Sequence, residues 1–348
     1  MALPAVPPIQ TILTYHVEGE LETPSREVFE EIAAQVILAD RLGYHAAWFA
    51  EHHFHVHRGH LPNPVLFALH LAGRTERIHL GSAVITSALH HPLRLAEDVI
   101  TTEVLTGGRL SIGLGSGSTK SEFAAFGVPE EDQEAEARHA RFAEGLDVLE
   151  QAWSGQPVSV HGRYVHVDCP PVLPHPDRSL SDLLWIAANS VAQASVSGRR
   201  GYGIMLSRER GPGEMQQIVE SYWRGRAEAG LPRDGGRVAA SRPVYVGASD
   251  RSAREEASNA VTEMVARQKR ERAQYRDLPP PADFDEACAR VQFVVGGPDS
   301  VAEEVRKLYD QVPFTHLHIQ PRWKGLTPQQ VEGSISRFQR EVIRLTRD

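Results

Sequence analysis

The chain has 348 residues, of which 41% are hydrophobic and 24% are charged, and its formal net charge is −8. These proportions are typical of globular proteins and exclude a fibrous or disordered chain, while the negative charge argues against a nucleic-acid partner. No stretch reaches the ~18 apolar residues of a membrane span, and the first residues lack the pattern of a signal peptide. With Cys169 and Cys288 as its two cysteines, the chain has no disulfide framework. We therefore expect a cytoplasmic protein with no membrane partner.

Short β-branched runs alternate with longer amphipathic stretches, which is typical of repeated β-α units around a parallel sheet. The first predicted helix has Thr23 as its cap and Pro24 at its first position, and it ends at Gly43. Similar boundaries predict a helix after Pro64 and another from Pro92. The predicted strands cover residues 9–14, 45–50, 78–85, 109–114, 183–188, 202–206, 242–246 and 315–320.

Two segments interrupt this alternation. Residues 156–167 alternate around a glycine and predict a hairpin inserted before the fifth strand. Residues 249–275 are rich in Arg and Glu and predict a solvated helix, which a proline-rich run follows, so we expect a lid or insertion at 249–285. No linker or tandem repeat divides the chain, which predicts a single domain over 1–348. Eight units without a Gly-x-Gly-x-x-Gly motif favour a closed (β/α)8 TIM barrel over a doubly wound sheet.

In such barrels the reacting groups lie at the carboxyl ends of the strands. Glu51, His52 and His53 follow the second predicted strand, and a carboxylate beside two imidazoles suits general acid–base chemistry. Because parallel strands end at one mouth, the polar or small residues that follow the later strands are expected nearby. These are Thr86, the loop 115–118, Asn189-Ser190 and Arg208.

Each pattern also has a structural or different chemical explanation. A histidine pair at a strand end is often structural, and the cluster of His52, His53, His55, His57 and His60 resembles the ligand set of a metal site. The ends of the later strands lack the Asp, Glu and His that such a site requires, so we predict no metal. A glycine-rich loop can be a tight turn. Asn189-Ser190 can be an ordinary helix cap, although a helix start also offers a seat for phosphate.

Four segments taken together resemble the bacterial luciferase-like flavin monooxygenases. They are AWFAEHHF (47–54), NPVLFALHLAGRTERIHLGSAVI (63–85), HPLRLAEDV (91–99) and GGRLSIGLGSG (107–117). The similarity extends from residue 9 to 208, and GGPDSVAEEV (296–305) resembles a late helix of the family. The resemblance implies a luciferase-like (β/α)8 barrel with insertions, FMN bound across its mouth, and oxidation of a small organic substrate by reduced FMN and dioxygen.

The resemblance also implies roles for single residues. His52 matches the catalytic histidine of the family and would act as a general base, with Glu51 beside it and His53 as a weaker candidate. Ala83 and Val84 match a pair joined by a non-proline cis peptide under the flavin. The other cofactor contacts expected at the mouth are Thr86, Glu97, Gly115, Ser116, Ser118, Asn189, Ser190, Gln193 and Arg208, with Asn189, Ser190 and Gln193 as the phosphate seat.

Two positions depart from luciferase itself. Ser116 stands where luciferase has an arginine for the phosphate, and Arg208 stands where it has a tryptophan near the flavin, so light emission is not expected. Arg208 or another basic side chain could restore the missing charge. No nicotinamide-binding motif is present, which predicts that a separate flavin reductase supplies reduced FMN. The resemblance further implies a homodimer.

Three alternatives remain open from the sequence. The same barrel family contains deazaflavin-dependent oxidoreductases that transfer hydride without oxygen. A flavin-binding protein without catalysis is the second alternative, which the intact Glu51-His52 pair disfavours. A metal-dependent hydrolase is the third. The substrate cannot be predicted, because residues 249–285 are expected to set the specificity.

Overall fold

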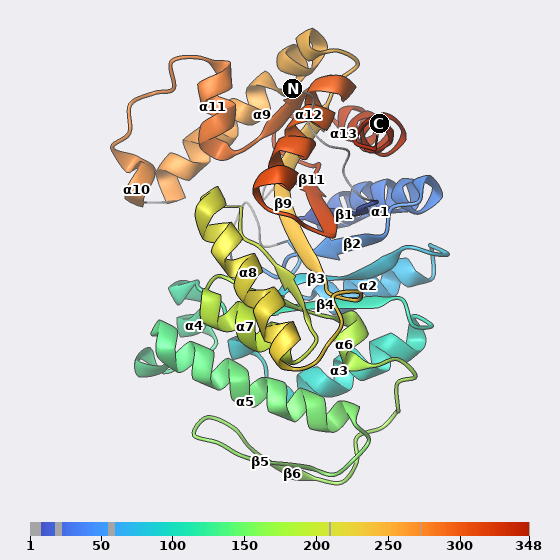
Figure 1. The fold of residues 1–348 in the computed structure, drawn as a ribbon, viewed down its shortest axis with the longest axis vertical. Coiled ribbons are helices and arrows are strands. Elements are labelled where there is room, and N and C mark those ends of the chain that lie inside the picture. Colours follow the sequence, from blue (N-terminus) through green and yellow to red (C-terminus); the bar gives the residue numbers. More distant parts are fainter. Residues whose placement is uncertain (1–7, 18–22, 55–59, 209, 272, 348) are drawn as a thin grey trace.

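The computed structural model describes residues 8–17, 23–54, 60–208, 210–271 and 273–347 (Figure 1). Eight parallel strands close into a barrel, which confirms the predicted fold and all eight predicted strands. The ring closes where Ile204 of one strand pairs with Val238 of another. The latter strand begins at Val238 rather than at residue 242. In order around the ring the strands are β9 (Val238–Val246), β11 (His316–Gln320), β1 (Gln10–Tyr15), β2 (Ala46–Phe49), β3 (His79–Thr86), β4 (Leu110–Gly115), β7 (Leu184–Ala187) and β8 (Gly203–Met205).

Helices between the strands cover the outside of the barrel. Pro24 occupies the N-cap of the first helix, so the predicted cap at Thr23 is wrong, whereas Gly43 ends this helix with a φ of 81° as predicted. Asn63 caps the next helix by accepting a hydrogen bond from the N–H of Leu66. The longer covering helices are α1 (Ser25–Leu42), α2 (Pro64–Ala72), α3 (Pro92–Leu105), α5 (Ala135–Trp153), α7 (Val191–Arg199), α8 (Pro212–Glu228), α12 (Pro298–Gln311) and α13 (Pro328–Arg337).

Shorter helical segments connect these elements. They are η1 (Ser87–Leu89), α4 (Lys120–Ala125), η2 (Glu130–Asp132), α6 (Leu180–Leu183), η3 (Phe338–Val342) and α14 (Ile343–Leu345). Within the part of the chain that the structure describes, no helix combines the length and the apolar character needed to cross a bilayer.

The predicted hairpin is the antiparallel pair β5 (Val158–His161) and β6 (His166–Cys169), which extends two residues beyond the predicted end at 167. The predicted insertion contains α9 (Asp250–Glu271), α10 (Ala273–Arg276) and α11 (Phe284–Val291), which lie together at one end of the molecule (Figure 1). A further strand, β10 (Val294–Gly296), was not predicted and pairs with the end of β9. α9 is not fully solvated, because Ala253, Ala257 and Val261 are buried in a small separate core.

Two tryptophans fill the middle of the barrel. The rings of Trp48 and Trp185 meet edge to face with centroids 5.1 Å apart, and both side chains are fully buried. Ile12 and Met205 pack in the same cluster, against which Ala83 and Val84 lie at its upper surface. The inside of the barrel is therefore packed, and within the barrel a ligand finds room at the ends of the strands.

Three histidines pack at the amino-terminal end of the barrel, where the strands begin. The ring of His45 lies 5.1 Å from that of His79 and 5.4 Å from that of His316. Burial, reinforced by nearby positive charge, lowers the pKa of His45 and of His79 to about 4 and that of His316 well below its usual value. All three imidazoles are consequently neutral in the folded protein at neutral pH.

We predict that the folded state loses stability as the pH falls from 6.5 towards 4. The unfolded chain binds protons at these histidines below their ordinary pKa near 6.5, while the folded chain does not. Each imidazole should remove up to about 1.4 kcal/mol of unfolding free energy per pH unit in this window, whose upper half lies above the ordinary pKa values of carboxylates. Urea unfolding at a series of pH values measures this slope. His79→Gln should reduce this slope by the contribution of one titrating imidazole. An unfolding free energy of the wild-type protein that does not change between pH 6.5 and 5 would contradict the prediction.

Candidate functional site

A cavity of about 290 Å³ lies at the carboxyl ends of the strands. The barrel contributes residues from several strand ends to its walls, among them His16, Ala83, Val84, Asn189, Ser241 and His318. The segment expected as a lid covers the other side, with Met264, Arg267, Gln268 and Tyr275 from α9 and α10, followed by Arg290, Val291 and Gln292 at the end of α11. The cavity is thus enclosed between the strand ends and the inserted helices.

The floor of the cavity is formed by Ala83 and Val84, which are joined by a cis peptide bond as the resemblance implied. The glycines of β4 make room for Val84. A Cβ atom on Gly115 would lie 2.9 Å from Val84 Cγ2, and one on Gly113 would lie 3.0 Å from Val84 Cγ1. The glycine-rich segment therefore serves close packing beneath the cavity and is more than a tight turn.

The predicted phosphate seat is the start of α7. Ser190 caps the helix, since its Oγ accepts a hydrogen bond from the N–H of Gln193 at 3.2 Å, and Gln193 Oε1 accepts from the N–H of Asn189 at 3.3 Å. The amides of the first turn point out of the helix, where its positive dipole end favours an anion. Asn189 lines the cavity, so this helix start opens onto it. Asn189, Ser190 and Gln193 are brought together as predicted.

Two arginines lie at this end of the barrel. Arg208, which follows β8, lines the cavity, and its guanidinium lies 5.4 Å over the ring of Trp323. Arg138 of α5 was not predicted, and it donates a hydrogen bond to the carbonyl of Gly117 in the loop after β4. This loop carries Ser116, which is half-buried, and Ser118, which is exposed, and neither of the two lines the cavity. Arg138 therefore places a cation beside the loop in which Ser116 replaces the phosphate-binding arginine of luciferase.

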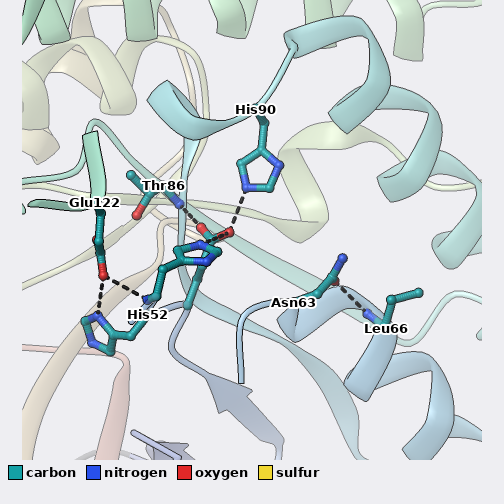
Figure 2. A network of polar contacts seen from close by, with 8 residues as sticks. His52, Asn63, Leu66, Thr86, His90 and Glu122 are labelled. Atoms are coloured by element: carbon teal, nitrogen blue, oxygen red, sulfur yellow. Dashed lines mark hydrogen bonds and ion pairs between the residues drawn. The ribbon is translucent and has the colours of Figure 1, made fainter. Parts of the chain in front are cut away.

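Glu51 is fully buried and fixes two imidazoles and a backbone amide (Figure 2). Its Oε1 accepts a hydrogen bond from His90 Nε2 at 2.7 Å and lies 3.3 Å from His53 Nε2, while its Oε2 accepts from the N–H of Thr86. Burial alone would raise the pKa of Glu51, but the hydrogen bonds from His53, His90 and Thr86 lower it overall. Glu51 therefore remains ionised and acts as an anchor. Thr86, expected at the cofactor, uses its amide to hold this anchor.

The carboxylate beside His52 comes from Glu122 of α4 (Figure 2). Glu122 Oε1 lies 3.7 Å from His52 Nδ1 and accepts a hydrogen bond from the N–H of His53 at 2.9 Å. On the other side of the ring, His52 Nε2 lies 3.3 Å from Nδ1 of His16, and the two rings are stacked. His16 lines the cavity. The expected Glu51-His52 pairing is corrected to a row of Glu122, His52 and His16.

The sequence offered a signal for one of these missed residues. His16 directly follows Tyr15, the last residue of β1, so the strand-end rule that selected His52 also applies to it. Glu122 and His90 lie on a helix and a loop beyond the strand ends, and no spacing in the sequence connects them to the histidine pair.

Two expected site residues lie elsewhere. Glu97 is on the exposed face of α3, where its Oε2 lies 3.4 Å from Arg94 Nη1 and where it lines an outer groove next to α2, so the structure does not bring it to the mouth. His53 is buried, and its ring packs edge to face on Phe126 at 4.7 Å. His55 and His57 lie outside the described residues. Within the described ranges, no group of three or more His, Cys, Asp or Glu side chains is arranged to hold a metal ion.

We predict that Glu51→Gln lowers the unfolding free energy by about 1–3 kcal/mol, because the amide leaves one of the buried donors unpaired. Glu97→Gln is the matched control, and its effect should stay within about 0.5 kcal/mol because Glu97 is exposed. Urea unfolding at pH 7 compares both variants with the wild-type protein. Equal stability of the two variants would show that Glu51 does not organise this part of the site.

Comparison with known proteins places this geometry in a family. A family model described as luciferase-like monooxygenase matches residues 8–316. The structure of the monooxygenase RslO1 from Streptomyces bottropensis is similar with a TM-score of 0.83 and 24% identity, over 97% of this chain and 99% of that chain. The oxygenating constituent of 3,6-diketocamphane monooxygenase from Pseudomonas putida, solved in complex with FMN, is similar with a TM-score of 0.82 and 19% identity, over 97% and 98% of the two chains.

Among curated relatives, the F420-dependent glucose-6-phosphate dehydrogenase of Beutenbergia cavernae is 29% identical over 184 residues, which are 52% of this chain and 53% of that protein. The first curated relatives are matched over 63%, 50% and 53% of their own length. The family model, in contrast, covers nearly the whole barrel. The chain belongs to the luciferase-like monooxygenase family.

Proposed function

We propose that this protein is a flavin-dependent oxidoreductase, and specifically an FMN-dependent monooxygenase that oxidises a small organic substrate with reduced flavin and dioxygen. The observation that carries the proposal is one cavity lined by Asn189 at the start of α7, by the Ala83-Val84 pair and by His16. β7 and β1 lie opposite each other in the eight-stranded ring, and β3 lies between them. The phosphate seat, the Ala83-Val84 floor and the two stacked imidazoles thus lie at one rim of the barrel.

The residues of the cavity fit a flavin phosphate in charge and in space. The dipole end of α7 and Arg208 favour a dianion, and Gly113 and Gly115 allow the floor to sit low beneath it. Asn189, Ser190, Gln193 and Arg208 would hold the phosphate end, and Ala83 and Val84 would support the ring. Reduced flavin supplies the electrons that activate dioxygen, a chemistry that protein side chains lack.

The row of Glu122, His52 and His16 would accept and transfer a proton from the substrate. The carboxylate of Glu122 favours the tautomer of His52 with its proton on Nδ1, so that Nε2 accepts a hydrogen bond from His16 Nδ1, which lies 3.3 Å away. His16 then accepts a proton from a substrate in the cavity that it lines. The inserted helices exclude water from this exchange. His52 keeps its proposed role as a base, and His16 is the imidazole closer to the substrate.

The cofactor and its supply are part of the proposal. The relative that uses F420 supports a deazaflavin-dependent oxidoreductase as the second candidate, whereas the structural neighbour with bound FMN, an oxygenating constituent, supports FMN and a separate reductase. The exposed Leu66 and Leu105 of α2 and α3 support a homodimer through this side of the barrel. A single domain over 1–348 and a cytoplasmic location remain predictions.

We predict that anaerobic titration with reduced FMN gives saturable binding at one site per chain, tighter by at least about tenfold than binding of reduced F420. Absorbance and fluorescence of the flavin follow the titration, and Ser190→Ala should weaken FMN more than riboflavin, because riboflavin lacks the phosphate. Preference for F420 would favour the deazaflavin alternative. Tight FMN binding without any product from a substrate screen would support the non-catalytic alternative.

We predict that His52→Ala and His16→Ala each reduce turnover by roughly 10²- to 10⁴-fold, the usual contribution of acid–base catalysis. Their affinity for FMN should change little, since neither imidazole is at the phosphate seat. Turnover is measured by mass spectrometry as incorporation of one atom from ¹⁸O₂ into the product. His70→Ala, at an exposed position of α2, is the control and should retain full activity. If His16→Ala turned over at the wild-type rate, the proposed proton transfer through Glu122, His52 and His16 would be refuted. A product without ¹⁸O would refute the proposed monooxygenase activity.

A further inference from the structure

The cavity contains buried polar atoms that no described residue satisfies. Nε2 of His318, and Oε1 of Gln320, Gln268 and Gln292, have no hydrogen-bond partner within the described ranges, and all four residues line the cavity. Buried polar groups in native proteins bind a partner, which is a ligand or water when no protein group is available. These four atoms therefore describe the hydrogen bonds that the preferred ligand should make.

Two of the four atoms lie on one strand of the barrel. His318 and Gln320 are two residues apart on β11, so both side chains point to the same face, and their exposed fractions are 6% and 7%. Nδ1 of His318 lies 3.0 Å from Thr14 Oγ1, and Nε2 of Gln320 donates to Ser241 Oγ at 3.2 Å. These contacts use one polar atom of each side chain, so His318 Nε2 and Gln320 Oε1 remain to bind a ligand.

The other two atoms belong to the covering helices. Gln268 on α9 donates its Nε2 to the carbonyl of Arg290 at 3.5 Å, while its Oε1 has no partner among the described residues. Gln292 follows α11 and lines the cavity, and its amide oxygen is the second one without a partner among the described residues. The described lining also includes Arg208, Arg267 and Arg290 but no Asp or Glu. The cavity thus offers several acceptors in positive surroundings.

We propose that the preferred substrate is a polyhydroxylated compound of phenolic or enolic character, with one hydroxyl bound between His318 Nε2 and Gln320 Oε1 and further hydroxyls that donate to the amide oxygen of Gln268 or of Gln292. This inference rests on the proposed function and names its substrate class. A hydroxyl donates to an amide oxygen and accepts from an imidazole N–H with the same oxygen atom. An ether oxygen only accepts, so it leaves Gln320 Oε1 unpaired.

Other substrate classes match the lining less well. An apolar substrate would leave all four polar atoms without partners, which disfavours its binding. A cationic substrate would face the arginines without a carboxylate among the described lining residues. Phenolic and enolic hydroxyls are acidic enough to be stabilised by nearby guanidinium groups, which an aliphatic alcohol is not.

The test compares two probes that differ only by methylation of their oxygens. Resorcinol and 1,3-dimethoxybenzene are titrated into the wild-type protein, with and without FMN, and their dissociation constants are measured by ligand-observed NMR. We expect resorcinol to bind at least about tenfold more tightly, because a site built for a hydroxyl discriminates strongly against analogues that cannot replace it. Equal affinities, or binding of neither probe, would overturn the proposal.

Variants assign the preference to the named residues. Gln320→Met and His318→Phe retain the size of the side chain and remove its polar atom, so each should bring the ratio of the two affinities close to one. Gln216→Met changes an exposed glutamine of α8 and should preserve the ratio. If His318→Phe does not fold, Gln320→Met alone decides. An unchanged ratio in Gln320→Met would overturn the assignment.

The outcome is distinguishable from a failure of the proposed function. A hydroxyl preference in a protein that does not bind FMN would refute the monooxygenase and leave the substrate class standing. Normal FMN binding without a hydroxyl preference would refute the substrate class alone.

Discussion

Closure of the parallel strands into one ring is the constraint on which the site depends. Because all eight strands run in the same direction, residues separated by hundreds of positions in the sequence end at the same rim. His16 after β1, Asn189 after β7 and His318 in β11 therefore share one cavity. Below them, Trp48 and Trp185 fill the barrel, so within the barrel a ligand finds room at this rim.

Two buried carboxylates have different roles at the pair His52-His53. Glu51 contacts His53 and His90 and is held by the amide of Thr86, which fixes the loop after β2 against the end of β3. Glu122 stands beside His52 and also accepts from the backbone of His53. A carboxylate that orients an imidazole and compensates its charge is a common arrangement for a base that must work near neutral pH.

The repeating pattern of β-branched runs and capped helices predicted the barrel, since each strand has to be buried on both faces and each helix on one. The strand-end rule selected Asn189 and Arg208, which line the cavity, and His52 and Ser190, which lie beside residues that line it. The resemblance predicted the Ala83-Val84 cis peptide, which the structure contains. Both failed where a partner arrives from outside the strand ends. Glu122, His90 and Arg138 come from helices or loops whose orientation depends on tertiary packing. Glu97 pairs with Arg94 on α3 and does not line the cavity, because similarity of sequence does not tell which face of a helix is turned towards the site.

We expect one flavin to span the rim from the start of α7 to the floor at Ala83-Val84. A crystal structure of the protein grown with FMN would show whether it does. Electron density is expected for the phosphate at the amides of Val191 and Ala192 beside Ser190, and for the ring over Val84 within reach of His16. Density for FMN outside this cavity, or a phosphate bound away from α7, would contradict it.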